Sequence, residues 1–232
     1  NPSNPCGKVF TMEEMQTIAE LAKKYDAYVV TDEVYEHIVY APNKHIYMQS
    51  LEGMRERTIV CNSLSKTYSI TGWRLGYVIA NPQIIDRVKK VHDFLTVGAA
   101  APLMEAAVVG LEFGDGYYDE LAAHYAHMKE VFVGGLKKLG LKYTDPQGAY
   151  YVLVDVSEFG VKDDVKFCEW MAQFVGVAAV PGSSFFREDV HNLVRFHFAK
   201  QDDTLNEAIK RLATLKEKAI NAKNVDLSLI HI

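Results

Sequence analysis

A polar stretch between two apolar runs constrains the fold of this chain most strongly. Residues 58–61 and 77–80 are short apolar runs that are typical of buried strands. Between them lies SLSKTYSITGWRLG, residues 63–76, which contains a single lysine, Lys66. Burying an ammonium group is costly unless it is paired or neutralised. We therefore expect two neighbouring strands with a buried, functional lysine in the segment that joins them.

The side chains around Lys66 indicate what such a lysine could bind. A fixed cation such as Arg74 would favour the neutral, nucleophilic form of the Lys66 amine. The serines of the stretch, together with Arg74, suit a phosphate group. An amine beside a phosphate site points to pyridoxal phosphate. A lone Ser-x-Ser-Lys is more often an exposed surface loop, so this short pattern alone leaves that alternative open.

The first half of the chain predicts alternating helices and strands. Thr11 and Glu14 have the spacing of a capping box, and apolar residues follow at helical spacing as far as Lys24. Residues 27–31 form a short apolar run that reads as a strand. Strands and helices alternating at this pitch predict an α/β fold with a mostly parallel sheet. Further helices are expected over residues 82–93, 99–111 and 117–139. The helix over residues 99–111 is rich in alanine and is expected to be buried.

The pattern changes in the C-terminal part of the chain. Beyond Gly140, short strands and helices alternate in an order typical of a small α+β domain. Strands are expected at 149–154, 177–180 and 193–198, and helices at 163–175 and 202–218. We therefore divide the chain into part of a large domain, residues 1–130, and a small domain, residues 131–226. Residues 227–232 resemble the translation of a sequencing adapter and are expected to be a non-native tail.

Two short motifs place polar side chains where ligands could bind. Asn4 stands in NPSNPCG, a loop dense in Asn, Pro and Gly that fixes where its amide points. Asp32 begins DEVYE and directly follows a predicted strand, at the end where open α/β sheets place their ligands. Taken alone, the first motif could be an ordinary turn and the second a carboxylate that caps one. Glu33 and Glu36 are expected to be structural.

A cation on a predicted strand is a further candidate. Arg195 lies in LVRFHFAK between Val194 and Phe196, so its side chain points to the face opposite theirs. A guanidinium can grip a carboxylate through two parallel hydrogen bonds. The alternative is a strand cation that is merely exposed to solvent.

Together these motifs resemble those of the class I/II aminotransferases, which are fold-type-I pyridoxal phosphate enzymes. Residues 63–76 resemble the family's lysine-attachment signature, and NPSNPCG resembles its NPxNPTG motif, with Cys6 where threonine is usual. DEVYE and LVRFHFAK resemble two further family segments. The resemblance covers residues 1–218, and the four motifs occur in the family's order.

The resemblance implies a role for each residue of the lysine segment. Lys66 matches the Schiff-base lysine, which is also the catalytic proton shuttle. Ser63 and Arg74 match ligands of the cofactor phosphate, and Ser65 matches the adjoining small position. These four residues are the first part of the implied cofactor site.

The other motifs complete the implied site. Asp32 matches a carboxylate paired with the pyridine nitrogen, and a buried carboxylate beside that nitrogen would keep the nitrogen protonated. Tyr35 and Asn4 match the residues that bond the phenolic oxygen of the cofactor. Arg195, together with Asn4, matches the group that holds the substrate's α-carboxylate.

The activity that the resemblance implies is amino-group transfer between an L-amino acid and a 2-oxo acid, by a homodimer when complete. GAYY (148–151) and RFHFAK look most like members that act on aromatic amino acids, methionine or kynurenine, and also like aspartate-type members. The same scaffold supports C–S lyases, decarboxylases and racemases, because the cofactor carries the chemistry. It also forms the ligand-sensing half of transcription regulators, which an upstream helix-turn-helix would reveal.

Composition argues against several other classes. A net charge of −5 gives no basic surface for nucleic acid or anionic membranes, and no apolar run reaches the roughly 18 residues of a membrane span. Three widely spaced cysteines, Cys6, Cys61 and Cys168, indicate reduced thiols and a cytoplasmic protein. His124 and His127 lie one helical turn apart without a third ligand, so no metal is expected.

The start of the chain suggests a longer parent protein. The sequence begins at Asn1 inside a motif and without methionine, so we expect it to lack an N-terminal part and to be inactive alone. In the family that part supplies a phosphate loop, an aromatic ring that stacks on the cofactor, and contacts to the partner subunit.

Overall fold

The computed structural model describes residues 1–225 and forms two compact units. Unit 1 consists of Asn1–Ser3, Lys8–Ala122 and Gln147–Ala149, and unit 2 of Asn4–Gly7, Ala123–Pro146 and the chain from Tyr150 onward. The expected tail, residues 227–232, lies outside the described residues. No helix among residues 1–225 is long and apolar enough to cross a membrane.

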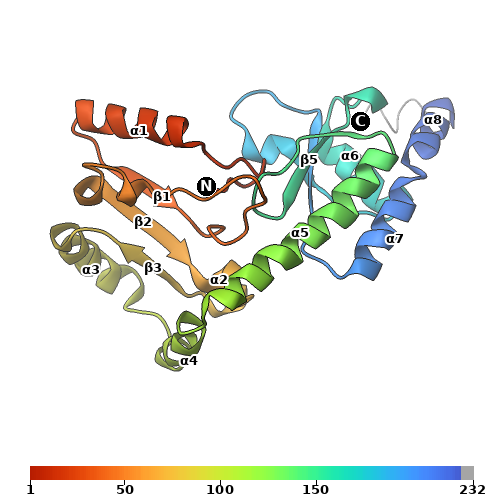
Figure 1. The fold of residues 1–232 in the computed structure, drawn as a ribbon. Coiled ribbons are helices and arrows are strands. Elements are labelled where there is room, and N and C mark those ends of the chain that lie inside the picture. The colour runs from red at the N-terminus through yellow and green to blue at the C-terminus, as the bar shows by residue number, and fades with distance from the viewer. Residues whose placement is uncertain (226–232) are drawn as a thin grey trace. The chain divides into compact units, whose positions relative to one another are not determined.

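Unit 1 contains a three-stranded sheet in the order β1-β2-β3, which Figure 1 shows beside the labelled helices. The strands are β1 (Val29–Asp32), β2 (Thr58–Ser63) and β3 (Gly76–Ile79). Strand β2 pairs parallel with β1 and antiparallel with β3. The three strands expected from the sequence are therefore confirmed to within two residues. The sequence did not reveal the antiparallel direction of β3.

Among residues 1–225, four α-helices lie wholly within unit 1. They are α1 (Met12–Lys24), α2 (Leu64–Thr67), α3 (Pro82–Thr96) and α4 (Ala101–Leu111). The predicted capping box is confirmed, because Thr11 Oγ1 accepts from the Glu14 N–H and the Glu14 carboxylate accepts from the Thr11 N–H. Helix α1 packs its apolar face into one core cluster of unit 1, formed by Met15, Ala19, Ala22, Met48 and Met54.

Two expectations about burial in unit 1 are wrong. Helix α4 was expected to be buried, but only Ala107 of its residues is buried. The apolar run of β3 was also expected to be buried, yet Val78 and Ile79 are 39% and 46% exposed. Within residues 1–225, strand β3 has a neighbouring strand on one side only. Apolar composition alone does not determine whether another element covers a face of a strand.

Unit 2 contains a four-stranded antiparallel sheet in the order β4-β5-β7-β6. Its strands are β4 (Lys142–Tyr143), β5 (Tyr151–Asp155), β6 (Val180–Pro181) and β7 (Leu193–His197). Its helices are α6 (Asp164–Trp170), α7 (Asp202–Leu212) and α8 (Leu215–Val225), and it shares α5 (Asp115–Lys138) with unit 1. This is the α+β pattern that the sequence predicted.

The buried centre of unit 2 lies between its sheet and helices. Strand β5 is buried over Tyr151–Val154, and Val194 and Phe196 of β7 are buried beside it. Phe132 of α5 and Leu205 of α7 are also buried there, with the Phe132 and Phe196 rings 5.7 Å apart. Short helical turns complete the chain at Met48–Ser50, Arg55–Arg57, Thr71–Trp73, Ser157–Phe159, Met171–Val175 and Gly182–Phe185.

Candidate active site

A pocket of about 330 Å³ in unit 1 gathers most of the residues singled out in the sequence. Its volume is at the small end of the range for ligand pockets, about 300–1,000 Å³. It is lined by Asp32, Val34, Cys61, Asn62, Ser63, Ser65, Lys66, Thr71 and Arg74. Five of these nine come from the predicted set: a carboxylate, two hydroxyls, an amine and a guanidinium.

The strand registers explain why these side chains meet. Asp32, the last residue of β1, pairs with Cys61 of β2, and paired residues of neighbouring strands point to the same face. Ser63 follows Cys61 by two residues and therefore shares that face. Thr58 and Val60 alternate with them and are buried on the opposite face. The carboxylate of β1 and the hydroxyl at the end of β2 thus open toward one side of the sheet.

A glycine allows β3 to pass close to this point. Gly76 pairs with Ser63, and a Cβ atom at Gly76 would lie 2.7 Å from the backbone oxygen of Asn62. Carbon and oxygen atoms do not approach so closely without displacement. The glycine of the Trp-Arg-Leu-Gly sequence is therefore required by backbone packing next to Ser63.

Hydrogen bonds fix the serine hydroxyls at the start of α2. Ser63 is the N-cap residue, and its Oγ accepts from the Ser65 N–H at 3.1 Å. The same Oγ lies 2.6 Å from Ser65 Oγ and 3.0 Å from the Leu75 backbone oxygen, to which it can donate. Thr71 Oγ1 donates to the Ser65 backbone oxygen at 3.2 Å. Two hydroxyl groups are thus held side by side at one end of the pocket.

Lys66 lines the pocket as the third residue of α2. Its neighbours Ser65 and Thr67 are buried, whereas Lys66 itself is only partly buried. The expectation of a fully buried lysine is therefore wrong, because the pocket that Lys66 lines is open to solvent. A partly exposed amine can still be reached by a ligand that enters the pocket.

Arg74 lies near the C-terminal end of the lysine segment, residues 63–76. Its backbone adopts the left-handed conformation, with φ at 58°, where the chain turns from Thr71–Trp73 into β3. The side chain is exposed, and its Nη1 donates to the Thr71 backbone oxygen at 2.9 Å. A guanidinium has five N–H donors, so this bond leaves donors for an anion in the pocket.

Asp32 is exposed, which corrects the expectation of a buried carboxylate. It ends β1 at the mouth of the pocket, where one carboxylate oxygen accepts from the Val34 N–H at 3.2 Å. The pKa of the thiol of Cys61, which pairs with Asp32 on the neighbouring strand, is raised. Burial is the larger cause, and the charge of the Asp32 carboxylate is the second. Tyr35, the next predicted residue of this segment, is buried at 5% exposure and is not among the residues lining the pocket.

The two remaining predicted residues lie together in unit 2. Arg195 Nη1 donates to Asn4 Oδ1 at 2.6 Å, although 191 positions separate the two residues. The guanidinium carbon lies 4.3 Å from the ring centre of Tyr151 and 4.5 Å from that of Phe185. The predicted alternation is confirmed, because Val194 and Phe196 are buried on the other face. The structure thus forms one group in unit 1 and a second group in unit 2.

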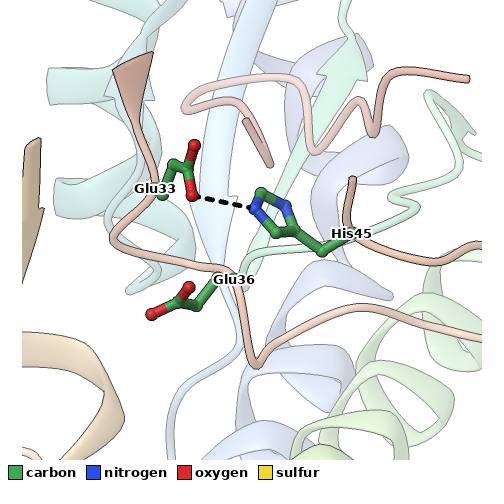
Figure 2. A group of neighbouring side chains, drawn as sticks. All are labelled: Glu33, Glu36 and His45. Carbon is green, nitrogen blue, oxygen red and sulfur yellow. Dashed lines mark hydrogen bonds and ion pairs between the residues drawn. The ribbon is translucent and has the colours of Figure 1, made fainter. Parts of the chain in front are cut away.

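Sequence reasoning missed a third group, formed by Glu33, Glu36 and His45 (Figure 2). His45 Nε2 lies 3.2 Å from Glu33 Oε2, and the potential ligand atoms of the three residues lie within 4.8 Å of one another. Figure 2 shows the second ring nitrogen of His45 pointing away from both carboxylates. In the sequence, only the carboxylates of DEVYE could be recognised as a group. His45 stands further along the chain, and the loop between Glu36 and His45 brings its ring to them.

The carboxylates of this group are already bound by other protein donors. Thr31 Oγ1 donates to Glu33 at 2.9 Å, and Asn62 Nδ2 donates to Glu36 at 2.6 Å. Burial, and then the Glu36 charge, raise the pKa of Tyr77 to about 12. These contacts tie the segment after β1 to the end of β2, which agrees with the structural role expected for Glu33 and Glu36.

Comparison with known proteins places this site in context. Residues 1–212 match the family described as aminotransferase class I and II. The "Probable N-succinyldiaminopimelate aminotransferase DapC" of Mycobacterium tuberculosis is 35% identical over 228 residues, which cover 94% of this chain and 57% of that protein. Methionine aminotransferase of Escherichia coli is 34% identical over 215 residues, covering 92% of this chain and 56% of that protein.

Solved structures give the same result for the fold. The structure of N-succinyldiaminopimelate aminotransferase from Mycobacterium tuberculosis superposes with a TM-score of 0.88 at 35% identity, over 93% of this chain and 56% of that one. The Escherichia coli structure described as having a methionine aminotransferase function gives a TM-score of 0.87 at 33% identity, over 92% and 57%. The chain thus spans somewhat more than half the length of these relatives.

Proposed function

Because the chain belongs to the aminotransferase class I and II family, we propose that the full-length protein transfers an amino group from an L-amino acid to a 2-oxo acid. Members of this family use pyridoxal phosphate. The observation that carries the proposal is the pocket of unit 1 that Asp32, Lys66 and Arg74 line together with two serines. This set would supply partners for the phosphate, the pyridine nitrogen and the aldehyde of the cofactor.

The phosphate end of the cofactor would be held by Ser63, Ser65 and Arg74. Two hydroxyl groups held side by side and a charged guanidinium are donors of the kind that bind phosphate oxygens. The hydrogen bond that Ser63 Oγ accepts from the Ser65 N–H supports this role, because it fixes the position of the oxygen. The single O–H of Ser63, which can donate to the Leu75 oxygen, would turn to the phosphate.

The ring of the cofactor would be oriented by the remaining residues. Asp32 would hold a proton on the pyridine nitrogen, since a neighbouring carboxylate favours the charged form of that group. Tyr35 and Asn4 would donate hydrogen bonds to the phenolic oxygen, a role supported by the motifs in which they stand. When bound, pyridoxal phosphate supplies a ring that accepts the electrons left at the substrate's α-carbon.

Lys66 would perform two tasks through its Nζ. It would bind the cofactor, and it would move the proton of the substrate's α-carbon as general base. Its partial exposure supports both tasks, because cofactor and substrate must reach the amine from the open pocket.

The substrate's α-carboxylate would be bound by Arg195 with Asn4. All the amino acids named for the relatives, from methionine to N-succinyldiaminopimelate, share that carboxylate, so this contact does not select among them. We propose an aromatic, methionine or kynurenine-type donor. Bovine kynurenine–oxoglutarate transaminase 3, 36% identical over 89% of this chain and 50% of its own length, supports that choice.

We also propose that the full-length protein is a cytoplasmic homodimer. The three cysteines are odd in number and widely spaced in the sequence, a pattern that supports a reducing compartment. Exposed apolar side chains gather at the end of α3, where Phe94 and Leu95 are 92% and 75% exposed. Exposed apolar patches of this kind mark interaction surfaces.

A transamination assay tests the proposal. The full-length protein, supplied with pyridoxal phosphate and 2-oxoglutarate, is offered a panel of L-amino acids, and glutamate formation is measured. We expect at least one aromatic amino acid, methionine or kynurenine to react. Lys66→Arg should lower turnover by about 100-fold or more, because general acid–base catalysis contributes about 10²–10⁴-fold.

The matched control is Lys44→Arg, which changes an exposed lysine of the same unit. It should leave turnover within about twofold of wild type. Glutamate formation that survives Lys66→Arg at the wild-type rate would contradict the assignment of Lys66. Absence of transfer from every amino acid, with cofactor bound, would contradict the proposed reaction.

A further inference from the structure

The helix that carries Lys66 is too short to hold itself in place. Helix α2 has four residues, and its backbone is closed by a hydrogen bond from the Tyr68 N–H to the Leu64 oxygen at 3.2 Å. Forming a single helical turn is unfavourable, because several backbone angles are fixed in return for one hydrogen bond. The position of Lys66 therefore depends on the side chains that fasten the two ends of α2.

The two ends are fastened by different parts of the chain. Ser63 caps the N-terminal end from within the lysine segment itself. At the other end, the Thr67 carbonyl is one of the helix-terminal oxygens that have no partner within the helix. This carbonyl accepts a hydrogen bond of 2.7 Å from the hydroxyl of Tyr117, which lies 50 positions further along, in the first turn of α5.

The direction of the Tyr117 hydroxyl is set by the packing of its ring. The rings of Tyr117 and Tyr68 are stacked, with centres 5.7 Å apart and an interplanar angle of 18°. Phe113 packs on Tyr117 at 4.8 Å, and the hydroxyls of Tyr68 and Tyr118 lie 2.9 Å apart. Gly110 of α4 leaves room for this stack, because a Cβ atom there would lie 3.1 Å from the Tyr68 ring.

The same packing keeps Tyr117 a donor. Burial, and then the neighbouring Tyr118, raise the pKa of the Tyr117 hydroxyl, so the proton that it donates stays in place at neutral and moderately basic pH. Replacing tyrosine by phenylalanine removes only this hydroxyl and retains the stacked ring. The contribution of the hydrogen bond can therefore be separated from that of the packing.

We propose that Tyr117 is a positioning residue for Lys66: its hydroxyl caps α2 through the Thr67 carbonyl and so fixes where the Lys66 amine lies in the pocket. The inference rests on the proposed function, because the position of Lys66 matters to the reaction only if its amine binds the cofactor and moves the substrate proton. Tyr117 itself does not line the pocket.

The test is Tyr117→Phe in the full-length protein, with two measurements. Amide hydrogen exchange without cofactor should be about 5- to 30-fold faster at Tyr68, because the loss of one hydrogen bond of about 1–2 kcal/mol frees the turn to open. With cofactor, kcat for a reactive amino acid should fall by about 3- to 30-fold while KM stays within about twofold, since Tyr117 orients the amine without contacting substrate.

Tyr28→Phe is the control, because Tyr28 belongs to the same unit and is 63% exposed. It should change neither measurement. Exchange at Tyr68 within about twofold of wild type, or an unchanged kcat, in Tyr117→Phe would overturn the positioning role while leaving the proposed function intact. A wild-type protein without transaminase activity would instead refute the proposed function, and exchange at Tyr68 would still report whether Tyr117 caps α2.

Discussion

Arg195, the proposed partner of the substrate carboxylate, is held in place by several contacts within unit 2. Its guanidinium carbon lies 4.3 Å from the ring centre of Tyr151 and 4.5 Å from that of Phe185, and its Nη1 donates to Asn4 Oδ1. Each cation–π contact contributes about 0.5–2 kcal/mol, depending on how far it is removed from water. The side chain is thereby held in one orientation, and the guanidinium still has donors for a carboxylate. Lysine could supply the charge at this position but not the planar, two-pronged fit.

Arg195→Lys in the full-length protein should therefore lower kcat/KM for a reactive amino acid by about 10- to 1,000-fold, or about 1.4–4 kcal/mol. The amine obtained by decarboxylating the same amino acid should be almost unaffected, because it has no carboxylate to bind. The measurement is a paired kinetic comparison of the two compounds in wild type and mutant. Equal losses for both would show that Arg195 supports the fold of unit 2 and does not bind substrate.

Single residues were predictable from the sequence wherever a local pattern determines them. The alternation of Val194, Arg195 and Phe196 on a strand was sufficient to orient Arg195. Burial was not predictable in the same way, since Asp32 and Lys66 are more exposed than their apolar flanking runs implied. How much water reaches a side chain depends on elements far along the chain, which a local pattern does not contain.

At the scale of elements, the pairing of β2 with β3 places a glycine beside one of the serines that line the pocket. The pair Ser63–Gly76 closes the end of the antiparallel ladder, and the missing side chain of Gly76 lets the strands approach at the Asn62 carbonyl. Ser63, a proposed phosphate ligand, lies directly at this contact. A side chain at position 76 would therefore disturb the site as well as the sheet.

Gly76→Ala should destabilise the full-length protein by about 1–3 kcal/mol, the usual cost of forcing extra atoms into a packed contact. It should also weaken the binding of pyridoxal phosphate, because displacement of the strands moves Ser63. Urea unfolding and a cofactor titration measure the two effects. Gly72→Ala is the matched control, since a Cβ atom there meets nothing within 4 Å. If both variants behave alike, the close approach at Gly76 has no bearing on the site.

Most elements could be predicted because their signals are local. The Thr11–Glu14 capping box marked the start of α1, and the apolar runs marked the three strands of unit 1. The antiparallel direction of β3, the exposure of α4 and the bond between Tyr117 and Thr67 could not be predicted. Each of these depends on a partner that is distant in the sequence, and the 50-residue separation of Tyr117 and Thr67 is an example.

At the scale of the whole molecule, the residues proposed for the site are divided between the two units. Lys66, Asp32 and the proposed phosphate ligands belong to unit 1, whereas Asn4 and Arg195 belong to unit 2. The NPSNPCG loop contributes Asn4–Gly7 to unit 2 although the residues on either side belong to unit 1. The motifs of one family, spread over the chain, thus fall in both units, and the order of the motifs identified the family without revealing this interleaving.

The central claim is that the pocket of unit 1 binds pyridoxal phosphate through Lys66, and peptide mapping tests it most directly. The full-length protein is incubated with pyridoxal phosphate, reduced with borohydride, digested, and the labelled peptide is identified by mass spectrometry. We predict that the label lies on Lys66, within the peptide derived from SLSKTYSITGWRLG, and that it is lost in Lys66→Arg. A label on any other lysine, or a wild-type protein that takes up no label, would contradict the account.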